Sequence, residues 1–151
     1  EIADKYHIPD GILELELTES IFFDDQGIEF VEKCIHRMHR LGFKCSLDDF
    51  GSGYSSLGLL REFDVDTIKL DRRFFLDISQ PKAEDVLICL TELGRRLGVQ
   101  IVAEGIETQE QIAFLKRVRC DMVQGYFYSR PLPAEEFWEW LEKRREGEGN
   151  Q

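Results

Sequence analysis

Acidic side chains follow two apolar segments of the chain, each at a point where a strand is predicted to end. Glu16 and Glu19 lie in the run Glu-Leu-Thr-Glu, and Asp48 and Asp49 directly follow the apolar residues 43–47. Carboxylate oxygens are the ligands that hard cations such as Mg²⁺ and Mn²⁺ prefer, and a carboxylate that bridges two such cations suits phosphodiester hydrolysis. We therefore favour a metal-binding site over the alternative of a solvated acidic loop.

Three further polar residues stand at or near the ends of the next apolar segments. Lys69 lies within the apolar residues 67–70, where an unpaired ammonium group would be costly. We expect Lys69 to pair with a carboxylate or to orient an attacking water; the alternative is a strand lysine that points between helices. Glu104 and Gln124 each precede a glycine, which lets backbone or ligand approach closely.

Strand-like and helix-like segments alternate along the chain. Strands are predicted at residues 12–17, 43–47, 66–70, 99–103 and 121–128, and helices at residues 27–41, 57–63, 83–97, 108–117 and 133–145. This alternation predicts a parallel α/β sheet, and a parallel barrel places its chemistry at the C-terminal ends of its strands. The 151 residues are too few for a complete eight-stranded barrel of about 250 residues. We therefore expect a partial (β/α)₈, TIM-like barrel of five strands with their helices, lacking its first strands.

Apolar periodicity predicts the buried faces of the helices, and polar residues predict where some of them begin. Thr108 is expected to cap the helix that runs through Arg117. Residues 1–7 have the composition of a helix end without a start signal, so we expect a fragment of a longer domain. The residues expected to face inward are Ile28, Val31, Ile35 and Met38, then Val86, Leu90, Leu93 and Leu97, and in the last helix Phe137, Trp138 and Leu141.

A loop rich in glycine and serine follows the aspartate pair. We expect it to bend sharply and to contact substrate or a second subunit, because it lies beside the proposed metal-binding acids. It lacks the third glycine of a dinucleotide-binding fingerprint, and the alternative is an ordinary flexible turn. The loop comprises Phe50, Gly51, Ser52, Gly53, Tyr54, Ser55 and Ser56.

Charge and cysteine content narrow the range of partners. The formal net charge of −11, from 30 acidic and 19 basic residues, argues against nucleic acid or an anionic membrane as a partner. No stretch approaches the roughly 20 apolar residues of a membrane span, so we expect no membrane contact by this segment. The four cysteines show no Cys-x-x-Cys pairing and are interpreted as buried thiols in a reducing compartment, which predicts a cytoplasmic location.

Five motifs follow one another along the chain: E-L-T-E-S (16–20), D-D-F-G-S-G-Y-S-S-L (48–57), I-K-L-D-R-R-F (68–74), I-V-A-E-G-I-E-T (101–108) and Q-G-Y-F-Y-S-R-P-L-P (124–133). In this order they closely resemble the EAL family of bacterial cyclic di-GMP phosphodiesterases, and the resemblance covers the whole chain. It implies a modified (β/α)₈ barrel that hydrolyses cyclic di-GMP to linear pGpG with two Mg²⁺ or Mn²⁺ ions.

The resemblance also assigns a role to each candidate site residue. Glu16 would be a metal ligand, Asp48 would bridge both metals, and Asp49 would bind the second. Lys69 would contact the catalytic water, Glu104 would be a metal ligand or base, and Gln124 would help to hold the site. Glu19 would tether the loop that follows Asp49, and Glu107 would support the site.

The chain departs from the family pattern in what it lacks. The Glu-Ala-Leu segment, a metal-binding Asn and a phosphate-binding Arg of the family have no counterpart in residues 1–151 and would lie upstream. We therefore expect an active parent domain, inactivity of this fragment alone, and a homodimer or strand-exchanged oligomer. Any membrane anchor of the parent protein would lie in upstream regions. The alternatives are a non-catalytic module that binds cyclic di-GMP or a protein, and a generic metal-dependent barrel hydrolase.

Overall fold

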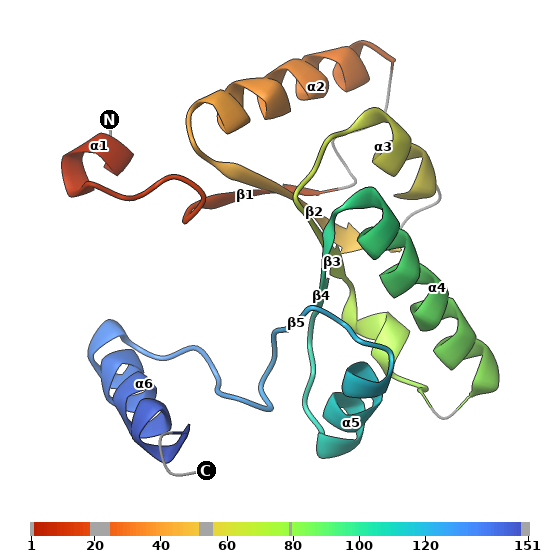
Figure 1. The fold of residues 1–151 in the computed structure, drawn as a ribbon, viewed down its shortest axis with the longest axis vertical. Coiled ribbons are helices and arrows are strands. Elements are labelled where there is room, and N and C mark those ends of the chain that lie inside the picture. The colour runs from red at the N-terminus through yellow and green to blue at the C-terminus, as the bar shows by residue number, and fades with distance from the viewer. Residues whose placement is uncertain (1, 19–24, 52–55, 79, 149–151) are drawn as a thin grey trace.

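Five strands pair in parallel in the order in which they occur in the sequence. The computed structural model describes residues 2–18, 25–51, 56–78 and 80–148. The sheet order is β1-β2-β3-β4-β5, and each strand is followed by a helix (Figure 1). The predicted α/β class with a parallel sheet is therefore confirmed. The elements are α1 (Ile2–Tyr6), β1 (Glu14–Thr18), α2 (Asp25–Arg40), β2 (Lys44–Phe50), α3 (Ser56–Glu62), β3 (Thr67–Leu70), η2 (Arg72–Phe75), α4 (Pro81–Leu97), β4 (Gln100–Ala103), α5 (Gln109–Arg117), β5 (Met122–Val123) and α6 (Ala134–Glu148).

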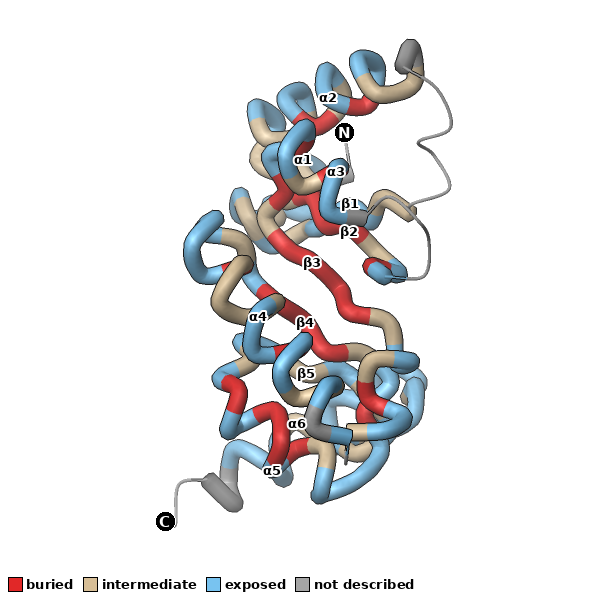
Figure 2. Tube along the Cα trace, turned by 90° about the vertical axis from the view of Figure 1, so that its right-hand side faces the viewer, coloured by how far each residue is buried: buried red, intermediate tan, exposed pale blue. Residues whose placement is uncertain are grey.

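The core lies between the sheet and the helices α2 to α5. Figure 1 shows these four helices along one side of the sheet, with α1 and α6 toward the other side. Buried residues concentrate on β2, β3 and β4 and on the sheet-facing sides of the helices (Figure 2). Every residue of β3 is buried, which is typical of a central parallel strand.

Two local predictions agree with the structure. Val31 and Ile35 of α2 are buried, and Ile28 and Met38 on the same face are partly buried. Thr108 caps α5: its side chain accepts a hydrogen bond from the backbone N–H of Gln111, whose side chain returns to the backbone of Thr108. This reciprocal arrangement fixes where α5 begins.

The buried faces of two helices differ from the prediction. In α4, Val86 and Leu97 are about half exposed, whereas Leu87 is buried. The reason is close approach at Gly94, where a Cβ atom would lie 2.7 Å from the Ile101 side chain and the helix meets β4. In α6, Phe137 and Trp138 are exposed and contact each other in an aromatic pair, so this helix does not bury them against the sheet.

Two strand boundaries also differ from the prediction. β2 continues through Asp48 and Asp49 to Phe50, where a loop was expected. β5 is limited to Met122–Val123, because the backbone N–H of Phe127 bonds to the carbonyl of Ile106 and the chain turns away from the sheet.

No helix in the described part of the chain is both long enough and apolar enough to cross a bilayer.

Candidate active site

Carboxylates from three segments converge on the ammonium group of Lys69. Lys69 Nζ lies 2.5 Å from Glu16 Oε1, 2.8 Å from Glu104 Oε1 and 3.5 Å from Asp48 Oδ1. Glu16 belongs to β1, Asp48 to β2 and Lys69 to β3, while Glu104 directly follows β4. The fold thus brings four of the predicted site residues together at the C-terminal ends of four adjacent strands, as a parallel barrel would.

The Lys69 side chain is only 8% exposed, and its partners decide its charge state. Burial opposes the charged form, but hydrogen bonds to Glu104 and Glu16 outweigh it and raise the pKa of Lys69 above the ordinary lysine value. Lys69 is therefore a permanent cation near neutral pH. It can donate hydrogen bonds to a water or to a phosphate oxygen, but it cannot accept a proton.

A bulge in β2 explains how Asp48 and Asp49 can both serve one site. Leu47 pairs with Ile68 and Phe50 with Leu70, so two residues of β2 stand opposite Lys69 alone. Asp49 takes a left-handed backbone conformation with φ of 54°, and its N–H donates to Asp48 Oδ1 at 2.9 Å. The bulge interrupts the alternation of a regular strand, which would send adjacent side chains to opposite faces.

Asp49 lies in a negative environment that includes Asp71. Burial, the Asp48 carboxylate and the Asp71 carboxylate raise the pKa of Asp49 above the usual aspartate value. Asp71 caps η2 by accepting hydrogen bonds from the backbone N–H and the Nε of Arg73, at 2.8 and 2.7 Å. Burial opposes the charged form of Asp71, but these bonds outweigh it and lower its pKa. The strand-end rule could have identified Asp71, since it directly follows β3.

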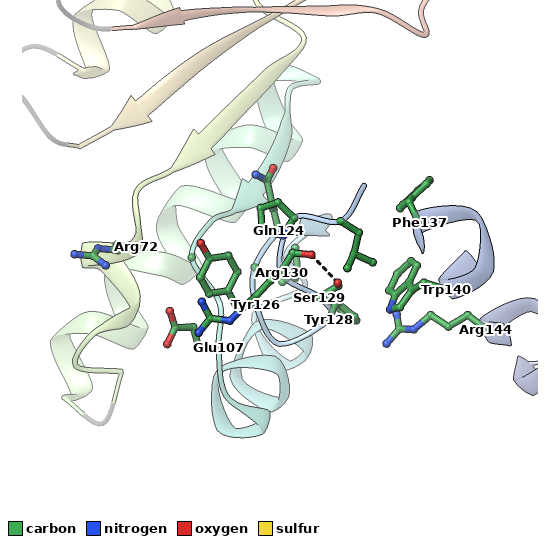
Figure 3. Close-up of a pocket in the computed structure, with 15 residues that line it drawn as sticks. Arg72, Glu107, Gln124, Tyr126, Tyr128, Ser129, Arg130, Phe137, Trp140 and Arg144 are labelled. Carbon is green, nitrogen blue, oxygen red and sulfur yellow. Dashed lines mark hydrogen bonds between the residues drawn. The ribbon is translucent and has the colours of Figure 1, made fainter. Parts of the chain in front are cut away.

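Gln124 and Glu107 line a neighbouring cavity and make no described contact with Lys69. This cavity, of about 850 Å³, lies between the segment that follows β5 and α6 (Figure 3). Its walls combine aromatic rings and arginines that the sequence reasoning did not select. The lining includes Arg72, Glu107, Gln124, Tyr126, Tyr128, Arg130, Trp140 and Arg144.

The glycines that follow Glu104 and Gln124 allow the close approach that was predicted. A Cβ atom on Gly125 would lie 2.1 Å from the carbonyl oxygen of Ile106, and one on Gly105 would lie 2.6 Å from Arg72 Cβ. Both contacts are with protein, so these glycines shape the walls of the site.

The structure describes only part of the predicted loop. Phe50 is buried in the core at 3% exposure, so it is not available to substrate or a second subunit, contrary to the prediction. Gly51 is exposed. Ser56 begins α3, and its side chain is not described. Glu19, Ser52, Gly53, Tyr54 and Ser55 lie outside the described residues.

The carboxylates have the chemistry of ligands for a hard cation, but here they surround Lys69. Within residues 2–18, 25–51, 56–78 and 80–148, no group of three or more His, Cys, Asp or Glu side chains could hold a metal ion. In the described part of the chain these carboxylates are therefore seen as partners of Lys69.

Comparison with known proteins gives a consistent result. A family model described as EAL domain matches residues 1–131. The cyclic di-GMP phosphodiesterase NbdA of Pseudomonas aeruginosa is 41% identical over 136 residues, which cover 88% of this chain and 17% of that protein. The chain therefore spans less than a fifth of the length of this curated relative.

Solved structures extend the similarity to the fold. The crystal structure of the EAL domain of Mycobacterium smegmatis DcpA matches with 36% identity and a TM-score of 0.86, covering 94% of this chain and 63% of that one. A structure of the PaMucR phosphodiesterase in complex with c-di-GMP matches with 34% identity and a TM-score of 0.78, covering 89% of this chain and 54% of that one. The chain thus corresponds to part of a longer chain in each case.

Proposed function

Because the chain belongs to the EAL domain family, we propose that it is the C-terminal portion of a domain that hydrolyses cyclic di-GMP to linear pGpG. NbdA, a cyclic di-GMP phosphodiesterase by name, is similar over most of the chain, and the PaMucR structure holds c-di-GMP. The observation that carries the proposal is the convergence of Glu16, Asp48 and Glu104 on Lys69.

The protonation state of Lys69 decides what it does in the reaction. As a permanent cation, it orients an attacking water or a phosphate oxygen and stabilises negative charge that develops in the transition state. The proton of the water must go to another group, and Glu104, whose carboxylate is 19% exposed and hydrogen-bonded to Lys69, is the best-placed acceptor. Asp48 completes the anionic wall opposite Lys69.

The neighbouring cavity is the proposed site for a guanine base of the substrate. The amide of Gln124 and the carboxylate of Glu107 offer hydrogen-bond partners to a base edge, and the ring of Tyr126 offers a stacking surface. Arg72 and Arg130 also line the cavity and can pair with phosphate oxygens. A dinucleotide with two phosphates would use both kinds of group.

We propose Mg²⁺ or Mn²⁺ as the cofactor, held in part by Glu16, Asp48, Asp49 and Glu104. The remaining ligands are proposed to come from the upstream Glu-Ala-Leu segment and Asn that the family resemblance implies. When bound, two such ions activate a water and stabilise the leaving oxygen of a phosphodiester. For this reason the 151-residue chain alone is expected to be inactive.

A non-catalytic module that binds cyclic di-GMP or a protein remains the second candidate. The observation that favours this candidate is that Glu16 and Glu104 pair with Lys69, and that the described residues do not form a metal site by themselves. We further propose a cytoplasmic location, in keeping with four free cysteines, and self-association through the edge of the sheet at β1.

The replacement Asp48→Asn in the complete domain tests the proposed function. Turnover should fall by more than about 10³-fold if Asp48 acts in the transition state, measured as pGpG released from cyclic di-GMP with Mg²⁺ or Mn²⁺. Asp85→Asn, an exposed acid on α4, is the matched control and should leave turnover unchanged. A variant that keeps a tenth of the activity would refute the role of Asp48. Binding without turnover in the unmodified domain would instead support the second candidate.

A further inference from the structure

Two glycines beside the site carboxylates both press against the single helical turn η2. Gly51 and Gly105 have positive φ angles of 88° and 64°. A Cβ atom on Gly51 would lie 2.3 Å from two ring carbons of Phe74, and one on Gly105 would lie 2.6 Å from Arg72 Cβ. A side chain at Gly51 would have to displace the Phe74 ring, and one at Gly105 would collide with Arg72 Cβ on η2 itself.

These two contacts lie directly next to the residues that surround Lys69. Gly51 follows Asp49 by two positions, and Gly105 immediately follows Glu104. η2 itself starts two residues after the end of β3, the strand that carries Lys69. One turn of helix therefore contacts the backbone on both sides of the Lys69 cluster.

η2 is well anchored for such a role. Its first turn is capped by Asp71, and Phe75 at its end is buried at 1% exposure. The carbonyl oxygen of Phe75 accepts a hydrogen bond from Gln111 Nε2 at 3.0 Å, so η2 is tied to the capping box of α5. The Phe74 ring is therefore carried by an anchored turn where it packs against Gly51.

From this geometry we infer that Phe74 is a positioning residue for the active site. Its ring packs against the backbone at Gly51, a contact that we call the seating. The seating holds the bulge of β2, with Asp48 and Asp49, in place relative to Lys69. Phe74 makes no described contact with the Lys69 cluster, so its effect on the site would pass through Gly51; its ring also contacts Phe75. The catalytic consequence rests on the proposed function, whereas the seating itself does not.

A double-mutant cycle on the 151-residue chain tests the seating. Gly51→Ala adds a Cβ that collides with the ring and also strains a left-handed backbone, whereas Gly51→Ala in a Phe74→Ala background keeps only the strain. The drop in melting temperature caused by Gly51→Ala should therefore be smaller by about 3 °C or more when Phe74 is absent. Gly98→Ala is the matched control, because Gly98 has a φ of 72° and nothing within 4 Å of its added Cβ, so its effect should not depend on Phe74. Equal effects of Gly51→Ala in both backgrounds would overturn the seating.

Amide hydrogen exchange tests whether the contact between Phe74 and Gly51 stabilises the bulge of β2. The N–H of Asp49 donates to Asp48 Oδ1, so Phe74→Ala should speed its exchange by about tenfold or more if the bulge loosens. The N–H of Cys45, which donates to Asp66 Oδ2 at the other end of β2, should be unaffected. Val31→Ala, on the buried face of α2, should change neither amide selectively. Uniform acceleration of both amides in Phe74→Ala would mean that Phe74 only stabilises the fold, and would overturn the inference.

Kinetics of the complete domain then separate this inference from the proposed function. Phe74→Ala should lower kcat by about tenfold or more with little change in KM, because misplaced catalytic groups slow the chemical step, whereas Val31→Ala should not. If Phe74→Ala and Val31→Ala had the same kcat, Phe74 would not position the site. If the unmodified domain were inactive, the proposed function would fail, and the cycle and the exchange data would still decide the seating.

Discussion

Lys69 Nζ on β3 donates a hydrogen bond to Glu16 Oε1 on β1 at 2.5 Å, across the intervening strand β2. The contact joins strands that are not neighbours and lie about 9–10 Å apart, a distance that the long lysine and glutamate side chains span together. The two residues are separated by 53 positions in the sequence. The Lys69 cluster is therefore both a candidate catalytic group and a link that holds β1 to the central sheet.

Replacement of Lys69 by methionine should destabilise the chain at neutral pH. The buried ammonium compensates three carboxylates, and removing one partner of a buried ion pair costs about 3–5 kcal/mol, less where a partner such as Glu16 is half exposed. The raised pKa of Lys69 means that its stabilising effect is complete below the ordinary lysine range and is lost only at higher pH. Urea unfolding at pH 7 measures the loss.

The pH dependence of this variant distinguishes charge from packing. In Lys69→Met the carboxylates repel one another, and protonation relieves the repulsion, so the deficit relative to wild type should shrink as the pH falls from 7 to 4. Lys82→Met, an exposed lysine on α4, should show no such trend. A deficit that is constant with pH would mean that the loss reflects packing alone.

The sequence predicted the Lys69 cluster because strand ends in a parallel sheet meet at one edge. Polar residues that follow apolar segments could therefore be assigned to one place before any contact was known. The same rule does not say which strand-end residues touch. Gln124 and Glu107 line the neighbouring cavity because the chain turns away after Val123, and that turn depends on a long-range backbone bond between Phe127 and Ile106.

Long-range packing also explains the other differences from the sequence prediction. The bulge at Asp48 and Asp49 exists only in the pairing of β2 with β3, and periodicity within one strand cannot reveal it. Phe74 contacts Gly51, although the two residues are 23 positions apart in the sequence. Helix α6 has aromatic residues at the spacing of a buried face, but the spacing does not say which part of the protein the face packs against.

The cysteines are not all buried, contrary to the sequence interpretation: Cys45 is buried, Cys34 and Cys120 are partly buried, and Cys89 is exposed. Cysteine reactivity should follow these differences in burial. Burial, assisted by nearby Asp66 and Glu14, raises the pKa of Cys45 to about 11, and burial raises the pKa of Cys120 to about 11. Both thiols should therefore resist iodoacetamide at pH 8, whereas the exposed Cys89 should react first. Mass spectrometry of a time course gives the order. Alkylation of Cys120 as fast as that of Cys89 would contradict the burial of Cys120.

The cap of α5 should contribute measurably to stability. Thr108→Ala removes the acceptor for the backbone N–H of Gln111 and should cost about 1 kcal/mol in the free energy of unfolding. Thr108→Ser keeps the hydroxyl group and should cost much less. Urea unfolding of the two variants provides the comparison, and similar losses for both would show that the capping bond is not what stabilises this end of α5.

The outer edge of β1 should lead to self-association. Within the described residues β1 pairs only with β2, and Ile12 just before β1 and Leu15 within it are 66% and 37% exposed. An unpaired strand edge with apolar neighbours favours pairing with a second copy, whereas the net charge of −11 opposes it, so association should strengthen with added salt.

Leu15→Lys places a charge on this edge and should weaken association by about tenfold or more, because edge lysines discourage strand pairing. Leu57→Lys, an equally simple change at an exposed leucine on α3, should have little effect. Sedimentation velocity over a range of protein and salt concentrations measures both variants. A chain that stays monomeric throughout, or equal weakening by the two replacements, would exclude β1 as the contact.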